Sequence, residues 1–183
     1  SIYDAMFLSA GELLMRQPGI VALHAVTSTN AFRYAFRMAS VDNTRRMILL
    51  QNAAFLPMFR EAMEGRGDVG KESIMDLTGS ESGADPLSIF QDVGKDNRKA
   101  ARKTLAFLDN QGGADKLIEQ ARLNVFLKGT DSHDYKFSSA VLEDFYYVSP
   151  EWRNRYLASS VYKLRGAGEN DNGLVERIKS AFV

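Results

Sequence analysis

Apolar residues recur at three- and four-residue spacing along most of this 183-residue chain, which is the spacing of one face of an α-helix. Glycine, proline and short polar runs separate these stretches, and none of them alternates apolar and polar residues as a strand does. With 45% apolar residues, the chain is long enough to enclose one core. The sequence therefore predicts an all-α fold, a single-domain helical bundle of about seven helices with a glycine-rich loop in the middle.

The predicted domain, residues 1–183, has three parts. Residues 1–63 hold three helices: the first stops at Gln17, the second starts at Pro18 and runs to about Ala39, and the third has a kink at Pro57. Residues 64–94 contain six of the fourteen glycines and are expected to form a loop or a lid, with short helices near 73–77 and 86–90. Residues 95–183 return to helices, expected at 95–108, 114–128, 132–148, 150–165 and 174–182.

Charge and composition exclude several classes of partner. The chain carries 23 basic and 23 acidic residues without a long block of either sign, so we expect no nucleic-acid partner and no membrane partner. No apolar run approaches the length of a membrane span. The chain has no cysteine, which excludes disulfides, thiolate metal sites and a cysteine nucleophile. A soluble protein is expected, with the cytoplasm as the default location.

The only two histidines of the chain each lie in a compact polar cluster on a predicted helix. In the first cluster His24, Thr27 and Tyr34 share one side of a helix that is apolar nearly all round, and such a helix belongs at the centre of a bundle. His24 there could act as a base, a hydrogen-bond donor or a metal ligand. The alternative is a buried structural histidine that is paired with a neighbouring hydroxyl or carbonyl group.

The second cluster opens a later helix, where His133, Lys136, Glu143 and Tyr147 share a face. An acid, a base and a cation on one face could carry out acid–base chemistry. The same grouping is also typical of an ordinary solvated helix surface. Asp131 is expected to cap this helix, and Asp134 to offset the helix dipole in its first turn.

A metal site is not predicted. His24 and His133 could bind iron or zinc with Asp131, Asp134 or Glu143, but no HExxH, ExxH or cysteine spacing supports such a site.

Two short motifs stand out: His24-Ala25-Val26-Thr27 followed by Ala31-Phe32-Arg33, and later His133-Asp134-Tyr135-Lys136. At these motifs the sequence resembles the questin oxidase-like family, and the likeness extends over about a third of the chain in two patches. The resemblance implies oxygen-dependent, Baeyer–Villiger-like opening of an aromatic ring system, with a nicotinamide reductant such as NADPH. No Gly-x-Gly-x-x-Gly follows a predicted strand, so NADPH binding is implied by the resemblance alone.

Together these patterns suggest an oxidoreductase or oxygenase that acts on a flat aromatic or phenolic small molecule. In this hypothesis His24 or His133 removes a proton and Lys136 or Arg33 stabilises the oxyanion. The substrate would lie against Thr27, Tyr34, Arg33 and Tyr135. Two alternatives remain open: a non-catalytic helical module, monomer or homodimer, with structural histidines, and a histidine-ligated metal or haem protein. The enzyme hypothesis requires both imidazoles to reach one substrate.

Overall fold

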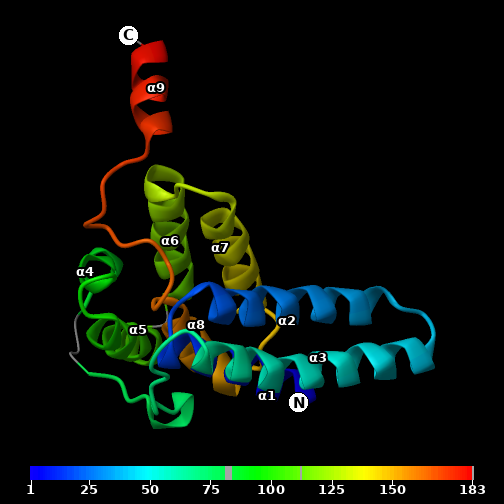
Figure 1. The fold of residues 1–183 in the computed structure, drawn as a ribbon. Coiled ribbons are helices and arrows are strands. Elements are labelled where there is room, and N and C mark those ends of the chain that lie inside the picture. Colours follow the sequence, from blue (N-terminus) through cyan, green and yellow to red (C-terminus); the bar gives the residue numbers. More distant parts are fainter. Residues whose placement is uncertain (81–83, 112, 183) are drawn as a thin grey trace.

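The computed structural model describes residues 1–80, 84–111 and 113–182 (Figure 1). Within these ranges the chain forms nine α-helices, one short 3₁₀ helix and no strand. The predicted all-α, single-domain fold is confirmed, with slightly more helices than the seven expected. The elements are α1 Ile2–Arg16, α2 Ile20–Met38, α3 Asp42–Glu64, η1 Ile74–Asp76, α4 Pro86–Asp92, α5 Asn97–Gln111, α6 Ala114–Lys128, α7 Ser132–Asp144, α8 Pro150–Ser160 and α9 Gly173–Ala181.

Most helix ends lie within a few residues of the predicted positions, and the exceptions have local causes. Helix α2 begins two residues after Pro18 because Gly19, its N-cap, has extended backbone. Helix α7 ends at Asp144, where the N–H groups of Tyr146 and Tyr147 bond back only three residues and tighten the chain into a turn. Pro150 opens α8 as predicted, but the Ser149 hydroxyl donates to Asp4 on α1 instead of capping the helix.

The core lies where α1, the first half of α2, α5, α7 and α8 meet. Phe7 on α1 and Tyr156 on α8 are fully buried and contact each other edge to face, with ring centroids 5.5 Å apart. Other large side chains that are almost completely buried are Leu14, Leu23, Ile89, Phe90, Leu117, Ile118, Phe137 and Leu157. Burial of each such side chain is worth roughly 1.5–3 kcal/mol, so this junction holds the helices in place.

Helix α2 is central to the bundle only along its first half, so the expectation for the whole helix was wrong. Its buried residues all lie between Val21 and Thr29. From Ala31 onward the helix pairs with α3 in a long antiparallel hairpin that projects from the body of the molecule (Figure 1). The apolar residues of its second half therefore face α3, solvent or the start of α1, where the ring of Phe36 contacts Tyr3.

The glycine-rich segment contains η1 and α4, close to the two short helices predicted there. Gly70 donates its N–H to the carbonyl oxygen of Arg16 (2.8 Å), and the Arg155 guanidinium donates to three carbonyl oxygens of residues 74–77. These bonds hold the segment against α1 and α8. Residues 81–83, part of the expected loop or lid, lie outside the described residues.

The last helix, α9, stands away from the rest of the molecule (Figure 1). Val175 is its buried residue, while Leu174 and Ile178 are half exposed or more. The chain before it is fixed by Asn172, which donates its backbone N–H to the carbonyl of Leu127 (2.7 Å). Across the part of the chain that the structure describes, no helix combines the length and apolarity needed to cross a membrane.

Candidate functional site

The two histidines meet where α2 contacts α7. The ring centroids of His24 and His133 lie 5.8 Å apart, and their planes are inclined by 78°, an edge-to-face contact. His24 is half-buried, and the side chain of His133 is 44% exposed, so the pair faces solvent on one side. Helix packing thus brings into contact two imidazoles that lie far apart in the sequence.

Asp131 fixes the position of His133. Its carboxylate caps α7 by accepting the backbone N–H of His133 (2.7 Å) and of Asp134 (3.3 Å), as predicted. The same carboxylate oxygen lies 3.5 Å from Nδ1 of His133. A carboxylate beside one ring nitrogen favours the proton on that nitrogen, which orients the ring.

The surroundings of His24 favour its neutral form. Partial burial lowers the pKa of His24, and electrostatic repulsion from the neighbouring His133 and Lys136 lowers it further. Lys136 is exposed on α7. Near pH 7 His24 is therefore a neutral proton acceptor with a cation close by.

These surroundings predict the titration of His24. In ¹H–¹⁵N or ¹H–¹³C NMR spectra we expect its pKa to lie below 6.5 and to rise in the His133→Ala variant, because one source of repulsion is removed. Because the pKa is lowered in the folded state, the contribution of His24 to stability is complete above pH 6.5 and decreases as pH falls through the folded pKa. The Ser139→Ala variant, which changes an exposed residue of α7, is the control. An unchanged His24 titration in His133→Ala would contradict the coupling of the rings.

The four residues expected to bind substrate lie in different places. Thr27 is buried within the bundle, whereas the Tyr34 side chain on the projecting hairpin is 65% exposed. The Tyr135 hydroxyl donates to the carbonyl oxygen of Gly129 (3.2 Å). Arg33 stacks between the rings of Tyr3 and Tyr147, about 5 Å from each centroid. The structure therefore groups the three expected catalytic residues but does not gather these four around them.

Arg33 belongs to a separate hollow of about 370 Å³. Arg37 and Arg45 line it together with three aromatic rings, and each guanidinium stacks on one of those rings. Arg33 therefore lies in a different part of the surface from the histidine pair, whereas Lys136 is close enough to His24 to affect its pKa.

Asp144, a fully buried carboxyl group at the end of α7, was not predicted from the sequence. It accepts hydrogen bonds from the Asn30 amide on α2 (2.8 Å) and from the Tyr156 hydroxyl on α8 (3.0 Å). Burial raises the pKa of Asp144 to about 7, and neighbouring Glu143 contributes in the same direction. Asp144 therefore ties α2, α7 and α8 together, at the opposite end of α7 from His133. The sequence did contain a sign of this burial. Asp144 lies seven residues, or about two helical turns, after Phe137, which places this acid on the apolar face of α7.

A metal site with three protein ligands is not formed among the described residues. No group of three or more histidine, cysteine, aspartate or glutamate side chains there is placed to hold a metal ion. Asp134 is engaged by Arg165 (2.6 Å), and Glu143 accepts from the Tyr147 hydroxyl (2.9 Å). The metal-protein alternative thus lacks a third ligand for His24 and His133 in this part of the chain.

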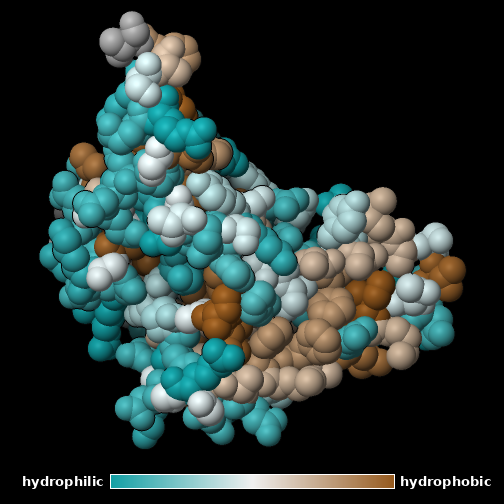
Figure 2. All heavy atoms as spheres, turned by 45° about the horizontal axis from the view of Figure 1, so that its top comes forward, coloured by the Kyte–Doolittle hydropathy of each residue, from teal (hydrophilic) through white to brown (hydrophobic). Residues whose placement is uncertain are grey.

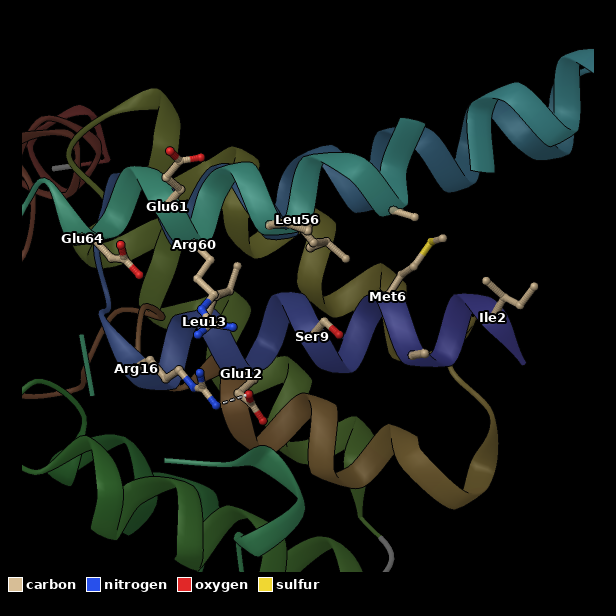
Figure 3. A pocket seen from close by; sticks show the side chains of 13 residues that line it. Ile2, Met6, Ser9, Glu12, Leu13, Arg16, Leu56, Arg60, Glu61 and Glu64 are labelled. Carbon is tan, nitrogen blue, oxygen red and sulfur yellow. Dashed lines mark ion pairs between the residues drawn. The ribbon is translucent and has the colours of Figure 1, made fainter. Parts of the chain in front are cut away.

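A second surface feature that the sequence did not reveal is a groove of about 840 Å³ between α1 and α3 (Figure 3). Met6, Leu13 and Leu56 form part of its apolar lining, and charged side chains, including the Glu12–Arg16 ion pair (2.6 Å), gather at one end. Neither histidine lines this groove. The molecule therefore presents two distinct candidate surfaces.

Comparison of the chain with protein-family models, with curated proteins and with solved structures found no match. The resemblance to the questin oxidase-like family accordingly rests on the two histidine motifs alone.

Proposed function

We propose that His24, His133 and Lys136 form an acid–base site that binds a small phenol-like molecule and accepts its proton. The observation that carries the proposal is the 5.8 Å contact between the two rings, which come from separate parts of the sequence. A general base must be largely unprotonated at the working pH, and the lowered pKa of His24 meets that condition.

The proposed step is a single proton transfer. The phenol O–H bond breaks, the proton moves to a ring nitrogen of His24, and the electron pair stays on the phenol oxygen. The positive charges of Lys136 and of the new imidazolium then stabilise the phenolate. The oxidation implied by the family resemblance would consume dioxygen and a nicotinamide reductant such as NADPH, and it enters the proposal through that resemblance only.

A nitrophenol tests the proposal, because its phenolate absorbs at longer wavelength than its neutral form. With excess protein at a pH near the nitrophenol pKa, we expect the absorbance to shift toward phenolate. The shift should disappear in His24→Ala and weaken severalfold in Lys136→Gln. The matched control is Lys116→Gln on α6, which should behave as the wild type. Circular dichroism verifies that each variant is folded.

Two results would overturn the acid–base site. One is the absence of any spectral shift with the folded wild-type protein. The other is a shift of equal size in His24→Ala, which would place the bound phenol elsewhere.

A second candidate function, a helical interaction module, is favoured by α3. This helix has 23 residues, yet only Asn52 and Met63 are buried. A helix with so much apolar side-chain surface in contact with water is typical of one that another helix covers.

A further inference from the structure

The solvent side of α3 carries an apolar stripe. Met47, Leu50 and Met58 are 59%, 63% and 61% exposed, and Ala54 between them is also exposed. Their spacing of three, four and four residues places them along one side of the helix. Asn52 and Met63, the buried residues of α3, lie on the opposite side, toward α1 and α2. The helix is therefore apolar on two sides, and the body of the molecule covers only one of them.

Figure 2 shows that apolar surface is concentrated on the part of the molecule formed by the projecting hairpin. Exposed apolar side chains there include Tyr34 and Met38 on α2, Val41 in the turn, and the stripe residues of α3. The rest of the surface visible in this view is mainly hydrophilic. Contiguous apolar patches on an otherwise polar surface mark sites of protein association.

We propose that this stripe binds the same stripe of a second copy of the chain, so that two α3 helices pack antiparallel around a twofold axis near Ala53 and Ala54. The inference deepens the interaction-module candidate and does not depend on the histidine pair. Two small residues at the axis allow the two backbones to approach closely. An interface built around a twofold axis uses the same patch on both copies and closes after two chains.

The charges along α3 fix the antiparallel direction. Arg46 lies near the start of the stripe and Glu61 near its end, both are exposed, and neither forms an ion pair with another described residue. A twofold axis between residues 53 and 54 places Arg46 of each copy opposite Glu61 of the other. A parallel arrangement would instead place like charges opposite each other, which is destabilising.

The same pairing joins the stripe to the groove of Figure 3. Leu50 of one copy falls opposite Pro57 of the other, and Pro57 lines the groove between α1 and α3. The exposed large apolar residues on α3 and beside the groove are Met47, Leu50, Met58 and Ile2. A second copy packed in this way covers the stripe and the adjoining side of the groove.

Sedimentation or light scattering of the full chain tests the proposal over a range of concentrations. We expect a dimer for the wild type at micromolar concentration and a monomer for Leu50→Glu, because the substitution buries two charges at the interface. Leu123→Glu on α6, at a position that is 51% exposed, is the matched control and should remain dimeric. A wild-type protein that stays monomeric up to the highest concentration measured, or a dimeric Leu50→Glu variant, would overturn the proposal.

Two further variants test the direction of packing. Arg46→Glu should weaken the dimer about tenfold, and addition of Glu61→Arg should restore it, because the charge pair is then reversed. Because the chain has no cysteine, a single introduced cysteine can form only an intermolecular disulfide. Ala54→Cys should cross-link readily under mild oxidation, whereas Met47→Cys should not. Cross-linking through residue 47 as well as through residue 54 would show parallel packing and contradict the proposed axis.

Discussion

Replacement of Asp144 by asparagine is expected to raise the free energy of unfolding by a few kcal/mol at pH 8 and to change it little at pH 4. Asp144 is fully buried, and burial raises its pKa to about 7 from an ordinary value of 3.8. In the folded state the carboxyl group therefore remains protonated to much higher pH than in the unfolded chain. Its stabilising contribution is complete below pH 3.8 and is lost as pH rises through about 7.

The size of the effect follows from the pKa difference. A difference of about three pH units between the folded and unfolded pKa corresponds to about 4 kcal/mol of folding free energy. This is an upper bound on the gain in Asp144→Asn, because the introduced amide must re-form the hydrogen bonds of the carboxyl group. That amide can still accept from Asn30 or Tyr156 and is neutral at every pH. Urea unfolding at pH 4, 6 and 8 measures the difference, with the exposed Glu151→Gln on α8 as the control. An equal loss of stability at pH 4 and pH 8 would contradict the raised pKa and indicate a packing defect.

Replacement of Arg165 by glutamine is expected to cost about 3–5 kcal/mol of folding stability at pH 7, because it leaves a buried carboxylate without its ion partner. The Arg165 guanidinium lies 2.6 Å from Asp134, whose side chain is only 3% exposed, and also pairs with Glu169 (2.7 Å). Burial alone would raise the pKa of Asp134, but the hydrogen bonds from Arg165 and from the backbone N–H of Thr130 outweigh it and lower the pKa. The pair connects α7 to the segment after α8.

The loss of stability in Arg165→Gln should depend on pH and on the presence of the Asp134 carboxylate. The lowered pKa of Asp134 means that its contribution is complete above pH 3.8 and is lost as pH falls through the folded pKa, so Arg165→Gln should cost less in acid. The double variant Asp134→Asn with Arg165→Gln should recover part of the loss at pH 7. Arg177→Gln, at an exposed position on α9, is the control and should change stability by less than about 0.5 kcal/mol. Equal losses in the Arg165 and Arg177 variants would refute the buried pair.

Asp134 shows which contacts of a residue can be predicted from local sequence patterns and which cannot. Its position in the first turn of α7 suggested a charge that offsets the helix dipole. In the structure it also accepts the N–H of Thr130 and binds Arg165, which lies in a distant part of the sequence. The helix position was readable from the sequence, but the ion pair depends on where α8 ends in space.

The same distinction between local patterns and tertiary contacts applies to the residues of the candidate site. The two histidine clusters and the Asp131 cap were visible because they are local patterns of polar residues on helices. The four expected substrate contacts were placed by helix spacing alone, but α2 leaves the body of the molecule after Asn30, so Arg33 and Tyr34 lie away from the histidine pair. Asp144 was missed although its spacing from Phe137 marks it as inward-facing.

Local sequence patterns were enough to predict the all-α class, the approximate positions of the helices and the two histidine clusters. These depend on apolar periodicity, caps, glycine and proline, which act within a few residues of the chain. Tertiary structure alone decided that His24 and His133 meet, that Asp144 is buried between Asn30 and Tyr156, and that one side of α3 stays exposed. Each of these depends on how separate helices cross, and that is set by the packing of the whole core rather than by any local run of residues.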